Sequence, residues 1–450
     1  MDVVSAVAKS RMSRTQYLVI FGGLLCNMID GYDLSVIGFA LPHLPVGFAS
    51  PVMKGWIVSM GLIGMAVGAI VLSPLADRYG RRLFIIGGVA LNLVAICATA
   101  LVSNAEGMLV GRFFTGVAVG VLSSLSIVLA QEYASAGKRN LATGFVTIGF
   151  SVGSVVGGIV GLSLVNAYGG AWQVFFVFGG VLTAIVLIYT VFFMPESLSF
   201  LVAQRTTKSR TQIAKISKSM GLTDVNPEAV LPPEREGTRD GKKGSLLDKQ
   251  FRTRTLLLWI GYTVVNAAYY FVATWTPQLI TNSSGSTATG TTAGTVLSLG
   301  SVVGAIAFGI IGMKVLSTKL AWISLVVAMA AQIVFALTME GGLALALAGI
   351  LGVAAFASLT SYVSSAPQLY PILLRGKGLG SMYGISRIGS IAAPILAGYA
   401  VAFMSAENMY LCASLLFGIS GCVAFVLWRL TSSHFTAERA ALAEPADTLV

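Results

Sequence analysis

Residues 64–82 read GMAVGAIVLSPLADRYGRR, an apolar run that ends in a short segment crowded with charge. The apolar run extends to Ala76, and it is followed at once by Asp77, Arg78, Arg81 and Arg82. A second apolar run then begins at residue 83. A membrane-spanning helix needs about 20 mostly apolar residues. The stretch therefore predicts two spanning helices joined by a tight charged loop.

The composition extends this prediction to the whole chain. Of the 450 residues, 56% are hydrophobic and only 10% are charged, whereas soluble domains carry about 25% charged residues. Lipid must therefore cover most of the exterior. Twelve candidate spans follow, six on each side of a long polar stretch, near residues 17–41, 54–75, 83–103, 107–131, 141–165, 172–194, 255–280, 291–312, 319–339, 342–366, 378–404 and 408–430.

The basic residues predict the orientation of these spans. The net charge is +11, yet 26 of the 29 Lys and Arg residues fall on the side shared by both termini and the loops after even-numbered spans. Cytoplasmic loops carry such an excess. We therefore expect both termini in the cytoplasm and no nucleic-acid partner. The three remaining cations are Lys54, Arg112 and Arg387.

The predicted fold is an all-α membrane protein with twelve transmembrane helices in two six-helix halves. An N-terminal tail precedes a bundle over 17–201, and a second bundle covers 255–430. The stretch 202–254 is polar and contains three prolines, so we interpret it as a cytoplasmic linker. The cytoplasmic tails are residues 1–16 and 431–450.

Four charged side chains fall deep inside predicted spans, where charges are costly and by default functional. Asp30 and Asp33 share one face of the first span with Asn27, because the three are spaced by three residues. The cations are Arg112 and Arg387. Asp33 and Arg112 lie at similar predicted depths, about 5 Å apart along the membrane normal, so we expect them to pair. A pair that only fixes two helices remains the structural alternative.

The segment around residues 64–82 resembles the loop signature of the major facilitator superfamily. The resemblance implies alternating access between two halves, with a conformational latch formed by Gly68, Asp77, Arg78, Gly80, Arg81 and Arg82. A weaker counterpart occupies residues 309–319 and lacks the acid and the paired arginines. It is consistent with an old six-helix repeat.

Three further segments resemble the aromatic acid:proton symporter family, at residues 27–42, 195–201 and 370–394. The resemblance implies that Asp30 and Asp33 couple transport to protons. It makes Arg112 and Arg387 candidates to hold a substrate carboxylate, a task that suits the planar guanidinium fork. Further candidates for substrate binding are Asn27, Asn266, Tyr269, Tyr270 and Tyr362.

We therefore expect a proton symporter that imports a small aromatic carboxylate, such as benzoate or a hydroxybenzoate. The alternatives are a proton-coupled exporter of drugs or metabolites, and a sugar or organic-acid facilitator. The only two histidines, His43 and His434, offer no catalytic triad or metal cluster, so we expect no enzyme, no metal and no cofactor beyond protons as coupling ion. We further expect a monomer in a bacterial inner membrane.

Overall fold

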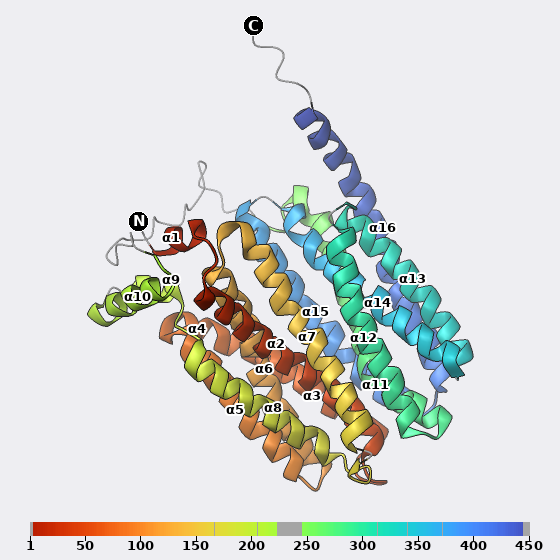
Figure 1. Cartoon of the computed structure of the whole chain (residues 1–450). Helices are drawn as coiled ribbons and strands as arrows, with labels where there is room; N and C mark the ends of the chain where they lie inside the picture. The colour runs from red at the N-terminus through yellow and green to blue at the C-terminus, as the bar shows by residue number, and fades with distance from the viewer. Residues whose placement is uncertain are drawn as a thin grey trace. The chain divides into compact units, whose positions relative to one another are not determined.

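The structure is a computed structural model that describes residues 3–165, 167–204, 206–222, 245–312, 314–339, 341–370 and 372–443. Within these ranges the chain is helical and contains no strand (Figure 1). The long helices are α2 (Arg14–Ala40), α3 (Pro51–Val67), α5 (Arg81–Leu101), α6 (Ala105–Tyr133), α7 (Arg139–Val160), α8 (Gln173–Phe193), α11 (Lys249–Ser284), α12 (Thr287–Ile311), α13 (Ser317–Thr338), α14 (Gly341–Ser365), α15 (Ile372–Ala400) and α16 (Ala406–Ala443).

Shorter elements complete the described part of the chain. They are the helices α1 (Val3–Lys9), α4 (Ser73–Tyr79), α9 (Leu198–Gln204) and α10 (Thr207–Ser219), the π-helical turns η2 (Gly68–Leu72) and η4 (Gly161–Val165), and the 3-10 turns η1 (Leu41–His43), η3 (Ala136–Lys138) and η5 (Ala366–Leu369). The turn η2 joins α3 to α4, so the predicted second span continues to Tyr79.

Eleven segments of the described residues are long and apolar enough to cross a membrane. They correspond to eleven of the twelve predicted spans. The remaining prediction, 378–404, falls on α15, which is not among the eleven. Its core carries Arg387, Ser386 and Ser390, and these polar residues lower its mean hydropathy.

The described chain divides into two compact units. The described residues within 1–237, 273–298 and 394–402 form the first, and those within 238–272, 299–393 and 403–450 form the second. The first unit thus includes segments of α11, α12 and α15, so its boundary differs from the predicted division into bundles. The division at 17–201 and 255–430 stays a prediction. Of the predicted linker, residues 205 and 223–244 lie outside the described part.

In the first unit α2 is the central helix. It packs against α6, α7 and α8, while α3 packs against α6 and α5 packs against α6 and α8 (Figure 1). Within the apolar window of each span, 83% of the α2 segment is buried, against 39% for α8. A helix buried on all sides has no lipid-facing stripe, so polar residues on α2 face protein. In the second unit α13 packs against α14 and α16.

Candidate functional site

The first polar group joins α2 to α6 by a buried ion pair. Arg112 Nη1 lies 2.6 Å from Asp33 Oδ1, and Arg112 Nη2 donates to the Asp33 carbonyl oxygen at 3.1 Å. Both residues are buried, with 2% and 4% exposure. The predicted pairing of Asp33 with Arg112, which was based on their similar depth in the membrane, is thus present in the structure. Charge-assisted hydrogen bonds of this kind are the stronger ones in proteins.

Neighbouring residues hold the guanidinium of Arg112 in place. Thr115 Oγ1, one turn further along α6, lies 3.4 Å from Arg112 Nη1. From α3, the backbone of Gly61 packs directly against the guanidinium, and a Cβ at Gly61 would lie 2.9 Å from Nη2. A side chain at position 61 would therefore displace the guanidinium of Arg112. Neither Thr115 nor Gly61 was predicted, because neither is charged.

The other two candidates on α2 are also buried. Asn27 donates from Nδ2 to Ser126 Oγ on α6 at 2.7 Å and to the Gly23 carbonyl at 3.2 Å. Asp30 is 6% exposed and lies one turn below Asp33. The ion pair of Arg112 is with Asp33. The first unit therefore contains two buried carboxyl groups one helical turn apart on α2, and one of them pairs with a buried guanidinium.

A second polar group, in the second unit, surrounds Arg387 on α15. Tyr383 precedes Arg387 by one helical turn on α15. The rings of Tyr383 and of Tyr262, on α11, pack edge to face with centroids 5.7 Å apart. Asn266 Nδ2 donates to the Tyr262 carbonyl oxygen at 2.9 Å. The group combines one cation with aromatic faces.

Sequence reasoning missed Tyr262 and Tyr383, although spacing could have found them. Tyr262 precedes Asn266 by four residues, and Tyr383 precedes Arg387 by four. Residues spaced by four share one helix face. Tyrosines in these positions are therefore expected to lie beside the predicted polar side chains Asn266 and Arg387.

The three tyrosines predicted on α11 and α14 pack among aromatic rings. Tyr269 contacts Tyr270 and Phe356, each with ring centroids 5.9 Å apart, and its hydroxyl bonds to Ser301. The Tyr362 ring lies 6.1 Å from that of Tyr262. Its hydroxyl donates to the Ser420 carbonyl on α16 at 3.0 Å. Tyr362 thus ties α14 to α16, next to the Arg387 group.

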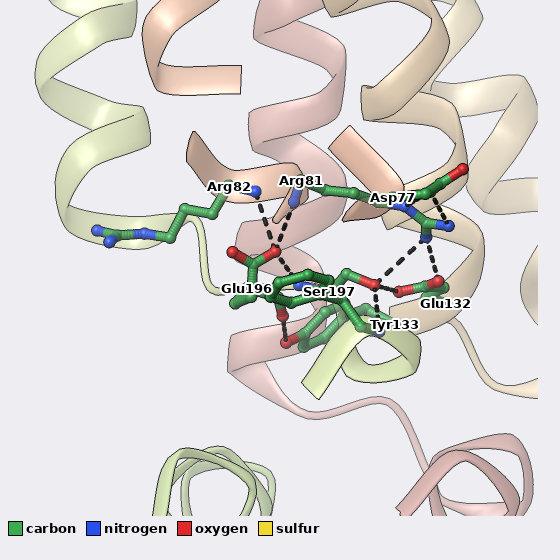
Figure 2. A network of polar contacts seen from close by, with 8 residues as sticks. Asp77, Arg81, Arg82, Glu132, Tyr133, Glu196 and Ser197 are labelled. Atoms are coloured by element: carbon green, nitrogen blue, oxygen red, sulfur yellow. Dashed lines mark hydrogen bonds and ion pairs between the residues drawn. The ribbon is translucent and has the colours of Figure 1, made fainter. Parts of the chain in front are cut away.

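The predicted latch residues lie at the turn between α4 and α5. Gly80 has a φ of +111°, a backbone conformation that favours glycine. The Glu196 carboxylate accepts from the backbone N–H groups of Arg81 at 2.8 Å, Arg82 at 3.0 Å and Ser197 at 2.8 Å (Figure 2). The first N–H groups of a helix lack partners inside it. Glu196 therefore caps α5 from a distant segment of the chain.

Arg81 links this turn to the end of α6. It forms ion pairs with Asp77, at 2.9 Å, and with Glu132 (Figure 2). The Ser197 hydroxyl donates to Glu132 at 2.6 Å, and the Tyr133 hydroxyl donates to the Glu196 carbonyl at 2.7 Å. Glu132 and Glu196 thus belong to this network but were absent from the predicted latch.

The remaining latch residues flank the network. Arg82 donates to the carbonyls of Met194 and Val191 at the end of α8, both at 2.7 Å. Arg78 is exposed, with its guanidinium 5.5 Å from the centre of the Tyr79 ring. Gly68 opens η2 where α3 packs closely on α6. Within the described residues no group of three His, Cys, Asp or Glu side chains could hold a metal ion.

Comparison with known proteins places this arrangement in a family. The model of the Major Facilitator Superfamily matches residues 23–394. The 4-hydroxybenzoate transporter PcaK of Acinetobacter baylyi is 27% identical over 405 residues, which cover 87% of this chain and 86% of that protein. The gallate transporter of Pseudomonas putida is 27% identical over 401 residues, which cover 88% of each. The predicted resemblance to aromatic acid transporters is thereby confirmed.

A solved structure with the same fold is the xylose transporter XylE from E. coli in a partially occluded inward-open conformation. It aligns with a TM-score of 0.72 over 92% of this chain and 99% of that chain, at 15% sequence identity. At this identity the likeness shows the fold alone.

Proposed function

Because this chain belongs to the Major Facilitator Superfamily, and so is a multi-pass membrane transporter rather than an enzyme, we propose that it imports a small aromatic carboxylate by proton symport with alternating access. Benzoate and hydroxybenzoates are the proposed substrates, and the inner membrane of a bacterium is the proposed location. Relatives named for the transport of 4-hydroxybenzoate, gallate and benzoate support this proposal.

The observation that carries the coupling proposal is the buried Asp33–Arg112 pair with Asp30 one turn away. Burial favours the neutral form of a carboxyl group, while an adjacent guanidinium favours the charged form. When Asp33 takes up a proton, its hold on Arg112 weakens, and the arginine becomes available to an anion. Asp30 supplies a second carboxyl group for the same cycle. One proton that enters with one monovalent anion carries no net charge across the membrane.

Arg387 and the tyrosines near it carry the proposed recognition of an aromatic acid. An arginine binds a carboxylate through two parallel hydrogen bonds. Aromatic rings such as Tyr262 and Tyr383 offer faces and edges against which a benzene ring packs favourably. The Asn266 amide can distinguish ring hydroxyl groups, because a hydrogen-bonding group left without its partner costs binding energy.

The test is uptake of labelled 4-hydroxybenzoate by the purified protein in proteoliposomes with an alkaline interior. We expect saturable uptake that an uncoupler abolishes. Protein-free liposomes correct for diffusion of the neutral acid across the bilayer. Uptake that ignores both the pH gradient and the uncoupler would reject proton symport. Transport of labelled sugars or efflux of dyes, in place of the aromatic acid, would favour the alternatives.

We also propose that α15 is the twelfth span and that both termini lie in the cytoplasm. The length of α15, 29 residues, is sufficient for a span at about 1.5 Å per residue. The distribution of Lys and Arg in the sequence supports this orientation.

A further inference from the structure

Lys54 is the one Lys or Arg in the predicted outer loops of this sequence. It lies in the first turn of α3, which begins after the capping residue Ser50. The side chain is half-buried. Its Nζ donates to the Leu41 carbonyl at 3.2 Å and to Gln278 Oε1 at 3.0 Å. All these residues belong to the first unit.

The two acceptors of Lys54 are neutral. Lys54 takes no part in the ion pairs Arg81–Asp77, Arg81–Glu132 and Arg112–Asp33. A half-buried ammonium group without a countercharge is costly. A neutral amide donor could make the same kind of hydrogen bond without that cost. These two hydrogen bonds therefore do not explain why Lys54 carries a positive charge. We infer that the charge has a further role.

Lys54 and the Arg112 site lie along one face of α3. Lys54 precedes Gly61 by seven residues, which is close to two full helical turns. Gly61 is the residue whose backbone packs on the Arg112 guanidinium. On α3, Lys54 and the point of contact with Arg112 therefore lie on the same side of the helix, about 10 Å apart along its axis.

Close packing covers this face at its outer end. A Cβ at Gly55, the next residue after Lys54, would lie 2.5 Å from the Pro394 carbonyl oxygen. Gln278, the side-chain partner of Lys54, lies on α11 and donates to Asn282 at 2.7 Å. Entry of a solute along α3 from this end requires the outer parts of α3, α11 and α15 to separate, and that movement releases Lys54 from Gln278.

We propose that Lys54 is an outer binding position for the substrate carboxylate, which replaces Gln278 as its partner when the outer ends of α3 and α11 separate. A carboxylate makes a charge-assisted bond with the ammonium group, which is stronger than the bond to a neutral amide. From there the anion moves two helical turns toward Arg112. This inference rests on the proposed transport of an aromatic carboxylate.

The test measures initial rates of labelled 4-hydroxybenzoate uptake against concentration in proteoliposomes, for the wild-type protein and for K54Q, K54R and Q278L. We expect K54Q to raise KM about tenfold, the usual size of one hydrogen bond to a charged group, and K54R to restore a KM near that of the wild type. Raising the salt concentration should raise the wild-type KM and have less effect on K54Q.

Q278L separates the two roles that Lys54 could have. This variant removes the hydrogen bond between α3 and α11 but keeps the charge, so its KM should not rise. Inhibition by uncharged benzamide should be equal in K54Q and the wild type. An unchanged KM in K54Q, or an equal rise in Q278L, would overturn the inference alone. Absence of any uptake by the wild-type protein would instead overturn the proposed function and this inference together.

Discussion

At the scale of single residues, Asp33 and Arg112 place opposite charges against each other where little of either surface is exposed. Removing one member of a buried pair leaves the other charge uncompensated, which typically costs 3–5 kcal/mol. Protonation has a milder effect, because the neutral acid can still form a hydrogen bond to the guanidinium. The proposed proton symport uses this difference, with Arg112 released when Asp33 is protonated and recaptured when it is not.

We predict that Asp33→Asn abolishes accumulation driven by a pH gradient while the protein still reaches the membrane. The amide keeps the shape of the side chain but cannot exchange a proton. S35A is the matched control, because Ser35 lies on the same helix and its hydroxyl bonds only to carbonyls of α2 among its described hydrogen bonds. Labelled substrate inside proteoliposomes at steady state gives the readout. Full accumulation by D33N would remove Asp33 from the coupling mechanism.

We predict that Gly61→Ala weakens both transport and stability. The new Cβ would lie 2.9 Å from Arg112 Nη2, so the guanidinium must shift from Asp33, at a cost of about 1–3 kcal/mol for overpacking. G87A is the control, because nothing lies within 4 Å of a Cβ there. Thermal denaturation in detergent should show a lower midpoint for G61A than for G87A. Equal midpoints would contradict the packing account.

At the scale of residues, charge was the feature of the sequence that predicted members of the site. Asp33 and Arg112 could be paired from hydropathy and helix rise alone, since charges are rare in spans. Gly61 could not be predicted as the contact of Arg112, because many glycines occur in the spans and only the packing of α3 on α6 distinguishes this one. Tyr262 and Tyr383 were not predicted, although each precedes a predicted polar residue, Asn266 or Arg387, by four positions on the same helix.

At the scale of helices, the first unit contains three short helices, α1, α9 and α10, which lie at one end of its long helices (Figure 1). Val3 and Val7 of α1, Ile213 of α10 and Met220, which follows α10, join one hydrophobic cluster with Leu201 of α9. The sequence analysis treated residues 1–16 as a tail and 202–254 as a linker. Their apolar residues are few and widely spaced, so only tertiary contacts show that parts of both segments are packed.

We predict that Ile213→Asp detaches α10 from this cluster. Ile213 is 1% exposed, and a carboxylate placed there without a partner should cost about 3 kcal/mol or more. A214D is the control, because Ala214 is the next residue of the same helix and is exposed. Limited proteolysis of the linker should be faster in I213D only. Equal rates in both variants would show that α10 is not held by its buried face.

At the scale of the whole molecule, we predict that α15 crosses the membrane, with its first residues on the inner side and its last residues on the outer side. Single cysteines are introduced into a cysteine-free background at Lys377, before the apolar part of α15, and at Phe403, which follows it and is 77% exposed. A membrane-impermeant maleimide should label F403C but not K377C in intact cells. V46C, in the first predicted outer loop, is the positive control, because Val46 is fully exposed. Labelling of both test sites, or of neither, would contradict a span at α15.

The superfamily fold could be predicted from the order of apolar runs and the segment at 64–82, because bilayer thickness fixes span length. The boundary between the two compact units could not be predicted from the sequence. Segments 273–298 and 394–402 join the first unit through contacts with helices far away in the sequence. Hydropathy reports whether a segment is apolar enough to cross a membrane, but it does not report which helix that segment contacts.

The cap that Glu196 places on α5 has a consequence for how the protein is made. The first backbone donors of α5 find their acceptor in a residue encoded 115 positions after Arg81. During synthesis the ribosome must therefore complete α6, α7 and α8 before this corner of the unit can close. Until then water satisfies those donors, and Arg81 lacks Ser197 as a neighbour. Assembly of this corner is thus a late event in translation, even though its first residues emerge early.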